Sequence, residues 1–392
     1  MISDKMAGLV KNSSIIRNMF KDGKEMAKKY GKENIFDFSL GNPSIAPPDC
    51  VKESIIDILN NEPELHGYMN NEGYEDVRKD IASYNNKCFG TNLTEQNIIM
   101  SVGAAGGLNV ALTSLVNAGD EVIVIAPYFG EYDNYISNVN GCKVVISPDY
   151  TRFAINFEEL ESKITCKTRF IIINSPNNPT GAVYTEEDII RLSDILNKKQ
   201  KEFGIQITLF SDEPYREIAF DNIKIPCIIK HYNNSIIGYS YSKSLSIPGE
   251  RIGYLVIPSE FNCFSDVINA MSTATRILGF VNAPSLMQKV VGKCIGKTAD
   301  ISVYEENRNI LYKALIEFGY ECIEPKGTFY MFPKCPIDDD IEFCNKAKEF
   351  KLIIVPGSGF GCAGYFRIAF CVDKEKVIQS LLSFKALIDY YK

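Results

Sequence analysis

Residues 170–181 read FIIINSPNNPTG, the clearest copy of a pattern that recurs through the middle of the chain. An apolar, β-branched run (170–174) ends in a loop of proline, asparagine and glycine. A helix-length amphipathic stretch (186–203) follows, with Thr185 as a candidate N-cap. A buried strand, a loop and a helix in succession are typical of parallel β-sheets.

Seven apolar runs of strand length occur between residues 97 and 258. They are 98–102, 122–126, 144–147, 170–174, 207–211, 236–240 and 254–257. Helix-length patterns such as 105–117 and 157–163 separate several of them. Strands that are apolar along their whole length are buried on both faces. We therefore expect an α/β fold whose large domain, residues 45–284, has a mostly parallel seven-stranded sheet between helices.

The two ends of the chain predict a second, smaller α/β domain. Residues 1–44 read as a helix and an extended arm that ends in a turn at 41–44. Residues 285–392 begin with one long helical pattern (285–318), and strand and helix patterns then alternate to the C-terminus. We expect residues 1–44 and 285–392 to fold together as the small domain.

The composition argues against several classes of protein. Of 392 residues, 45% are hydrophobic and 23% are charged, which are values of globular proteins. The 42 basic and 49 acidic side chains give a net charge of −7, so we expect no nucleic-acid partner. The chain has only His66 and His231, and none of its 12 cysteines stands in a C-x-x-C spacing. We therefore expect no metal site.

The expected location is the cytoplasm. Residues 1–11 lack the apolar segment of a signal peptide. The longest apolar stretches, such as 122–127, are too short to cross a bilayer, so we expect no membrane partner. The scattered cysteines read as reduced thiols.

One glycine-rich motif, GFGCAG at residues 359–364, has the G-x-G-x-x-G spacing of dinucleotide-binding proteins. It leads into another strand pattern, 365–370, and not into a helix. Without a helix N-terminus there is no row of free N–H groups for a pyrophosphate. A dinucleotide-binding dehydrogenase is therefore a poor fit to this sequence.

Polar residues stand where the predicted strands end, which is where open α/β sheets bind ligands. GAAGG (103–107) opens a helix after the first strand, and a helix N-terminus suits a phosphate. SDEPY (211–215) follows the fifth strand, and SYSK (240–243) follows the sixth, with Arg251 eight residues further on. A lysine at the end of an apolar strand can be desolvated, which lowers its pKa and makes its amine a usable nucleophile.

In this order along the chain, these motifs resemble those of the class I/II pyridoxal-5′-phosphate-dependent aminotransferases, of aspartate aminotransferase fold type. The resemblance covers almost the whole chain, and its most specific parts are PNNPTG (176–181) and S-x-S-K (240–243) with Arg251. It implies a transaminase that moves an amino group between an L-amino acid and a 2-oxo acid in ping-pong half-reactions.

The same resemblance implies which residues act on the cofactor, pyridoxal 5′-phosphate. Lys243 matches the lysine that holds the cofactor as an internal Schiff base and then shuttles the substrate proton. Asp212 matches the carboxylate that keeps the pyridinium nitrogen protonated. Tyr215 and Asn178 match donors to the phenolic oxygen. Phe129, rather than the neighbouring Tyr128, matches the aromatic residue that stacks on the pyridine ring of the cofactor.

The cofactor phosphate is expected at the start of the helix after the first strand. The residues that match phosphate contacts are the amides of Gly103, Ala104 and Ala105 and the side chains of Ser240, Ser242 and Arg251. Aspartate aminotransferase has a hydroxyl residue where Ala105 stands. One phosphate donor is therefore missing here, and we expect this chain to depend more on Arg251.

Arg367, in the strand pattern 365–369, matches the arginine that binds the substrate α-carboxylate in a bidentate fork. The backbone of Gly41 and the side-chain amide of Asn178 match groups that bind the same carboxylate beside this arginine. Tyr68 matches a tyrosine that reaches the phosphate of the neighbouring subunit, which implies a homodimer with shared sites. Arg276 stands near an arginine that binds the distal carboxylate in relatives acting on dicarboxylates, but its spacing differs from theirs.

Two other functions stay open beside the transaminase. C–S β-lyases use the same fold and cofactor residues, and release of pyruvate and ammonia without a 2-oxo-acid acceptor would identify one. A non-catalytic ligand sensor with an aminotransferase-like domain belongs to a different class. The presence of Lys243, Asp212 and Arg367, and the lack of a fused DNA-binding segment, argue against the sensor.

Overall fold

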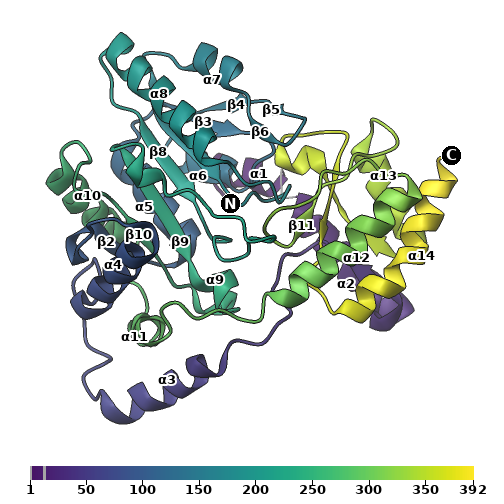
Figure 1. Ribbon diagram of the computed structural model, residues 1–392, viewed down its shortest axis with the longest axis horizontal. Coiled ribbons are helices and arrows are strands. Elements are labelled where there is room, and N and C mark those ends of the chain that lie inside the picture. Colours follow the sequence, from purple (N-terminus) through teal and green to yellow (C-terminus); the bar gives the residue numbers. More distant parts are fainter. Residues whose placement is uncertain (1, 12–14) are drawn as a thin grey trace.

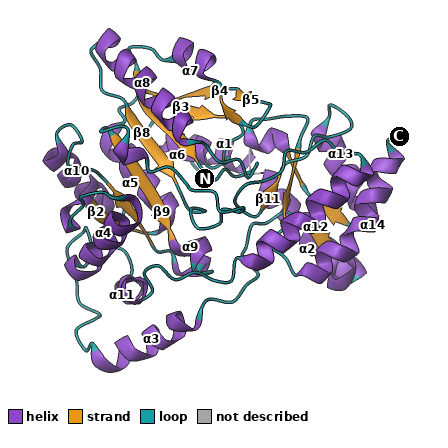
Figure 2. Ribbon diagram, in the orientation of Figure 1, coloured by secondary structure: helices purple, strands orange, loops and turns teal. Residues whose placement is uncertain are grey.

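The computed structural model describes residues 2–11 and 15–392, and its centre is a seven-stranded sheet (Figures 1 and 2). The strand order is β2 (Ile98–Ser101), β10 (Gly253–Val256), β9 (Ser235–Ser240), β8 (Thr208–Asp212), β7 (Thr168–Asn174), β3 (Glu121–Ile125) and β4 (Cys142–Ile146). Only β10 runs antiparallel to its neighbours. The predicted fold class is confirmed, and each strand overlaps one of the predicted runs.

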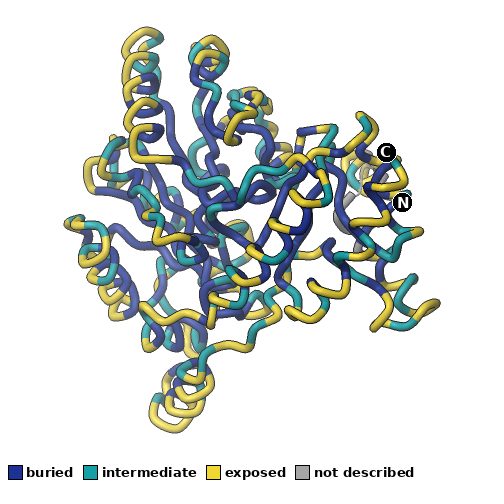
Figure 3. The backbone as a smooth tube through the Cα atoms, turned by 45° about the vertical axis from the view of Figure 1, so that its right-hand side comes forward, coloured by how far each residue is buried: buried dark blue, intermediate teal, exposed yellow. Residues whose placement is uncertain are grey.

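Alternate residues of the central strands pack into two separate cores. Ile171 and Ile173 of β7 lie in one core, and Phe170 and Ile172 lie in the other, as the two-residue period of a strand requires. The first core is covered by α3 (Asp49–Asn61), α4 (Glu75–Phe89), α7 (Phe157–Lys163), α8 (Glu186–Phe203) and α11 (Ser285–Lys293), and the second by α5 (Gly103–Leu115), α6 (Tyr132–Asn138) and α10 (Phe264–Ile277). Figure 3 shows the buried strands inside and the exposed outer turns of the helices.

The bounds of α8 follow from its end residues. Thr185 Oγ1 accepts from the Asp188 N–H at 3.2 Å, and Asp188 Oδ2 accepts from the Thr185 N–H at 2.9 Å. This reciprocal pair is a capping box. At the other end Gly204 adopts a left-handed φ of 63°, which glycine does without steric cost. The predicted helix 186–203 and its N-cap are confirmed.

A third core lies on the right of Figure 1 and combines both ends of the chain. Met19, Ile35 and Phe38 pack there against residues of the C-terminal segment. Two small sheets belong to this region: β1 (Phe36–Asp37) pairs with β12 (Leu352–Ile353), and β11 (Tyr330–Met331), β14 (Phe366–Ala369) and β13 (Val355–Pro356) form the other. Its helices are α2 (Ile15–Tyr30), α12 (Ser302–Phe318), α13 (Asp340–Ala347) and α14 (Lys374–Tyr390).

Residues 285–318 form two helices and not the single long helix predicted. α11 ends at Lys293, Gly296 adopts a left-handed φ of 73°, and α12 begins at Ser302. A left-handed residue cannot continue a right-handed helix. Val290 and Val291 of α11 pack in the first core of the large sheet. The predicted domain bounds, 1–44 with 285–392 against 45–284, stay a prediction, and we propose that the chain enters the small domain after α11.

The remaining elements are α1 (Asp4–Lys11), the hairpin of β5 (Pro148–Asp149) and β6 (Ala154–Ile155), and the short α9 (Tyr241–Ser244) after β9. The motif at 359–364 lies between β13 and β14 and leads into a strand, as predicted. Among the helices that the structure describes, none is long and apolar enough to cross a membrane.

Candidate active site

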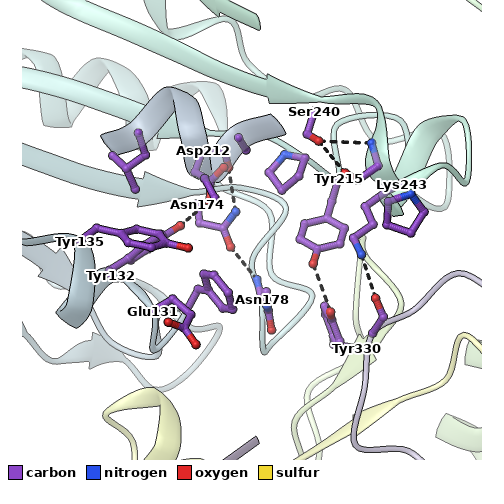
Figure 4. A pocket seen from close by; sticks show the side chains of 18 of the residues that line it. Glu131, Tyr132, Tyr135, Asn174, Asn178, Asp212, Tyr215, Ser240, Lys243 and Tyr330 are labelled. Carbon is purple, nitrogen blue, oxygen red and sulfur yellow. Dashed lines mark hydrogen bonds between the residues drawn. The ribbon is translucent and has the colours of Figure 1, made fainter. Parts of the chain in front are cut away.

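A cavity of about 510 Å³ lies where β7, β8 and β9 end, between the start of α5 and the small sheet of β11 and β14 (Figure 4). The predicted site residues that line it are Gly41, Ala104, Ala105, Phe129, Asn178, Asp212, Tyr215, Ser240, Ser242, Lys243, Arg251 and Arg367. Gly103 adjoins it as the first residue of α5, and Tyr68 lies elsewhere. In residues 2–11 and 15–392, no group of three or more His, Cys, Asp or Glu side chains is placed to hold a metal ion.

Lys243 reaches the cavity from α9. Its Nζ donates to the carbonyl oxygen of Gly41 at 2.8 Å and lies 5.5 Å from the ring centre of Phe329. Burial lowers the pKa of Lys243 from 10.5 to about 8, and the charges of Arg251 and Arg367 act in the same direction. An amine with this pKa is partly neutral near pH 7 and can act as a nucleophile.

Asp212 ends β8 and presents a carboxylate with one paired and one unpaired oxygen. Its Oδ2 accepts from the Tyr132 hydroxyl at 2.6 Å, whereas its buried Oδ1 has no partner among the described residues. Burial raises the pKa of Asp212 to about 7. A cationic N–H donor beside Oδ1 would satisfy this oxygen and favour the ionised carboxylate.

Tyr132 is a site residue that the sequence reasoning missed. It lies three residues after Phe129 at the start of α6, is 2% exposed and lines the cavity. The rings of Phe129 and Tyr132 meet edge to face at 5.7 Å. The signal for Tyr132 is its position in the aromatic run after β3, which also contains Tyr128 and Phe129. Tyr128 instead packs in the second core and does not line the cavity.

The loop after β7 is held by its own asparagines. Asn177 Oδ1 accepts from the backbone N–H and the hydroxyl of Thr180 at 3.1 and 2.8 Å. The Asn178 N–H donates to Asn174 Oδ1 at 2.7 Å, and Asn174 Nδ2 donates to the Asp212 carbonyl oxygen at 2.7 Å. These bonds fix the Asn178 side chain at the cavity wall and tie the loop to the end of β8.

Arg367 is a buried guanidinium that has no acidic partner among the described residues. It is 2% exposed on β14, between the rings of Tyr330 (4.5 Å) and Phe360 (4.8 Å). Its Nη1 donates to Asn178 Oδ1 at 3.0 Å and its Nη2 to the Ser39 carbonyl oxygen at 2.6 Å, whereas Nε has no partner in the described chain. Burial lowers the pKa of Arg367. Such a group is prepared to bind a carboxylate.

The start of α5 and Arg251 form the other end of the cavity. Gly103 has a left-handed φ of 70°, and a Cβ on it would lie 2.8 Å from Arg251 Nη2. Glycine therefore lets the guanidinium lie against the helix start. Ser240 Oγ donates to Ser242 Oγ at 2.9 Å, and Arg251 Nη1 donates to the Pro248 carbonyl oxygen at 2.9 Å. A helix N-terminus beside a cation and two hydroxyls is suited to a phosphate.

Tyr68 and Arg276 do not line the cavity of this chain. Tyr68 is 97% exposed, and Arg276 is exposed in the last turn of α10. Asn71 Nδ2 donates to the Val281 carbonyl oxygen at 2.5 Å, which holds the segment with Tyr68 beside the loop after α10.

Other lining residues also lie outside the predicted set. They include Leu40, Glu131, Tyr135 and Tyr330. Tyr330 and Leu40 come from the small-domain segments, so only the folded chain brings them to the end of the large sheet. Glu131 and Tyr135 follow β3 in the same segment as Phe129, and no motif marks them.

Comparisons with known proteins agree with this geometry. Residues 33–383 match the family model for aminotransferase class I and II. The chain is 30% identical over 389 residues to aspartate aminotransferase of Pyrococcus horikoshii, covering 95% of this chain and 94% of the relative. It is also 30% identical over 389 residues to aromatic-amino-acid aminotransferase 2 of Thermococcus litoralis, covering 94% of each.

Solved structures give the same result. An amino transferase from Eubacterium rectale matches with a TM-score of 0.97 and 44% identity over 100% of both chains. Aspartate aminotransferase from Thermotoga maritima matches with a TM-score of 0.89 and 25% identity over 99% of this chain and 100% of the other.

Proposed function

The chain belongs to the class I and II aminotransferases, and we propose that it binds its cofactor and its amino acid in the cavity between Lys243, Asp212 and Arg367. The enzyme is a pyridoxal-phosphate-dependent transaminase that moves an amino group between an amino acid and a 2-oxo acid. One observation carries the assignment of the residues. In the described part of the chain, a lysine of lowered pKa, a buried carboxylate with an unpaired oxygen and a buried guanidinium without an acidic partner face one cavity.

The residues of the cavity fit pyridoxal 5′-phosphate. The unpaired Oδ1 of Asp212 suits the protonated ring nitrogen, and the start of α5 beside Arg251 suits the phosphate. The ring of Phe129 is exposed to the cavity between these two ends. The bound cofactor supplies an electron sink for the negative charge that develops on the substrate Cα.

Lys243 has two tasks in this proposal. Its amine would hold the cofactor covalently, and when free it would move a proton to and from the substrate Cα. A pKa of about 8 suits both tasks, because the amine can lose and regain a proton near neutral pH. Asp212 would keep the ring nitrogen protonated, while Tyr215 and Asn178 would donate to the phenolic oxygen.

Arg367 binds the substrate α-carboxylate in this proposal. Asn178 and the Ser39 carbonyl oxygen hold the guanidinium from one side. Its remaining N–H groups can then form two parallel charge-assisted hydrogen bonds with a planar carboxylate. Arg367 also contacts Asn178, the proposed donor to the phenolic oxygen of the cofactor. Binding of the carboxylate is therefore linked to the position of this donor.

A homodimer with shared sites is also part of the proposal. Tyr68 is exposed beside the loop after α10, where Ile277, Leu278 and Val281 are exposed as well. Clustered exposed apolar side chains are typical of protein interfaces. On α3, at the lower end of Figures 1 and 3, Ile56 and Leu59 are also exposed. We keep the cytoplasmic location as a proposal that cell fractionation would test.

A half-reaction screen tests the function. The purified, cofactor-loaded protein is mixed with single amino acids, and the visible band of the cofactor is followed. Aspartate and aromatic amino acids come first, because relatives are named for them. A true donor converts the band without any acceptor, and a 2-oxo acid restores it. Release of pyruvate and ammonia without an acceptor would identify a β-lyase, and an unchanged band with every amino acid would contradict the proposal.

A further inference from the structure

Tyr330 of β11 lies between the Tyr215 hydroxyl and the Arg367 guanidinium, which have separate roles in the proposed function. Its hydroxyl oxygen lies 3.1 Å from that of Tyr215, and its ring centre lies 4.5 Å from Cζ of Arg367. Figure 4 shows the two hydroxyls facing each other in the cavity wall. Tyr330 and Tyr215 are 3% and 5% exposed, so their hydrogen bond is shielded from bulk water.

The surroundings hold the Tyr330 hydroxyl in place. The backbone of Gly41 packs directly against this hydroxyl, so that a Cβ on Gly41 would overlap it. The rings of Tyr215 and Tyr330 meet edge to face at 5.7 Å. The Tyr330 N–H donates to Thr328 Oγ1 at 3.1 Å. These contacts hold the Tyr330 ring with its hydroxyl oxygen beside that of Tyr215.

The charges nearby act differently on the two phenols. Burial raises the pKa of both phenols. The Arg367 charge over its ring and the hydrogen bond with Tyr215 hold the pKa of Tyr330 down, although Cys371 opposes them. Tyr330 and Asp212 raise the pKa of Tyr215 further, against the opposing charge of Arg367.

Tyr215 has one hydroxyl hydrogen, which the proposed function assigns to the phenolic oxygen of the cofactor, so the Tyr330 hydroxyl is the donor of the bond between the two tyrosines. Tyr215 then accepts this bond and keeps its own hydrogen for the cavity. Lys243, another charged residue that lines the cavity, is bonded to Gly41.

We propose that Tyr330 is a positioning residue that strengthens Tyr215 as a donor and makes its strength depend on whether Arg367 holds a carboxylate. The proposal rests on the roles given above to Tyr215 and Arg367. While Arg367 has no anionic partner, its charge polarises Tyr330, and Tyr330 in turn polarises Tyr215. A carboxylate on Arg367 neutralises that charge and weakens the whole chain of donors.

The acid–base midpoint of the cofactor band reports this effect. A hydrogen bond donated to the phenolic oxygen withdraws electron density from the cofactor. It thereby lowers the proton affinity of the nitrogen through which Lys243 holds it. Weakening the donor raises the midpoint. Carboxylate binding is therefore expected to raise it in the wild-type enzyme, and part of this rise depends on the Tyr330 hydroxyl.

The experiment is a pH titration of the visible band of the holoenzyme, with and without saturating acetate, a carboxylate that has no amino group to react. Tyr215→Phe is expected to raise the midpoint by about 1–2 pH units, because it removes a hydrogen bond to a charged oxygen. Tyr330→Phe keeps the ring under Arg367 and removes only the hydroxyl. It is expected to raise the midpoint by about 0.1–0.6 unit, in line with 10–30% cooperativity, and to reduce the acetate-induced rise.

Tyr320→Phe is the matched control. It also removes a buried hydroxyl, one that donates to the Phe384 carbonyl oxygen at 2.9 Å, but it does not line the cavity. It should leave both midpoints unchanged. The role of Tyr330 is wrong if Tyr215→Phe shifts the midpoint and Tyr330→Phe does not. It is also wrong if acetate raises the midpoint of Tyr330→Phe as much as that of the wild type. In both cases the proposed function stands. If Tyr215→Phe has no effect, the proposed site itself is wrong.

Discussion

Arg367 and Asp212 are two buried charged residues whose neighbours leave part of each group unpaired. No carboxylate of the described chain lies within ion-pair distance of Arg367, and Asp212 Oδ1 has no hydrogen-bond partner there. A buried charge without a partner lowers the stability of a protein unless a ligand pairs with it. At the residue scale, the unpaired atoms therefore indicate where the bound molecules place their own charges.

Arg367→Lys should lower kcat/KM for amino acids by about 10–100-fold. Lysine keeps the charge but loses one of two charge-assisted bonds, each worth about 1.5–3 kcal/mol. Affinity for the cofactor should stay nearly the same, because Arg367 lies at the end of the cavity away from α5. Steady-state kinetics and a cofactor titration measure the two effects.

Arg152→Lys is the control for this change. Arg152 forms two parallel hydrogen bonds with the Asp188 carboxylate, at 2.6 and 2.8 Å, outside the cavity. The change to lysine disrupts this pair of bonds, as Arg367→Lys would disrupt the pair with the substrate. Unchanged amino-acid turnover in Arg367→Lys, or weaker cofactor binding in its place, would show that the carboxylate is held by other residues.

Tyr132→Phe should weaken cofactor binding by about 10–100-fold, the equivalent of a hydrogen bond to a charged group. The Tyr132 hydroxyl stabilises the ionised form of Asp212, and only that form pairs with a protonated ring nitrogen. Equilibrium dialysis of cofactor against the free protein measures the loss. Tyr232→Phe, which loses a buried bond to the Ile207 carbonyl oxygen, should bind the cofactor like the wild type. Equal affinities of Tyr132→Phe and wild type would rule out this role.

At the scale of elements, α5 connects the sheet to the phosphate end of the cavity. It begins directly after β2 at Gly103, and its first turn lies beside Arg251 from the segment between α9 and β10. The helix start supplies free N–H groups, and the neighbouring guanidinium supplies the charge. Only a residue without Cβ lets these two parts meet.

Gly103→Ala should reduce both stability and cofactor affinity. A left-handed alanine costs about 1–2 kcal/mol, and its Cβ would also displace the Arg251 guanidinium. Gly90→Ala is the control, because Gly90 has a similar φ of 66° and nothing within 4 Å of its Cβ position. Thermal unfolding should show comparable losses in both variants, and cofactor titration a loss in Gly103→Ala alone. Equal cofactor affinity in the two variants would contradict the assigned phosphate site.

Elements were predictable from the sequence where their pattern is local and long enough. The strand β7 and the helix α8 carry apolar periodicity and capping residues within their own segments. Two-residue strands such as β1 and β12 carry no period, and their pairing depends on residues more than 300 positions apart. The break between α11 and α12 depends on the conformation of Gly296, which an amphipathic pattern does not contain.

At the scale of the whole molecule, we propose that the active site is completed by Tyr68 of a second chain. Lys243→Ala and Tyr68→Phe chains, each impaired alone, should regain activity when they form hybrid dimers. If Tyr68 acts on the partner's phosphate, one site of the hybrid carries both changes and the other carries neither. The two chains are co-expressed with different tags, and the doubly tagged dimer is purified and assayed. Hybrid activity no higher than that of the parents, or full activity in a monomer, would exclude a shared site.

Contacts between distant segments explain which site residues were missed. Lys243, Asp212 and Arg251 stand in motifs that the sequence displays directly, and the cavity brings them together. Tyr330 meets Tyr215 across 115 residues, and Tyr132 meets Asp212 across 80. Tyr330 does not differ in its local sequence from an ordinary core residue. The aromatic run that contains Tyr132 does not show which of its rings reaches Asp212, so only the folded chain identifies that contact.

Borohydride reduction followed by peptide mass analysis tests whether the amine of Lys243 holds the cofactor covalently. Reduction should fix the cofactor on the peptide that contains Lys243 in the wild type. The Lys243→Ala protein should fold, carry no fixed cofactor and lose transamination. Cofactor fixed on a different lysine, or full transamination by Lys243→Ala, would contradict the account.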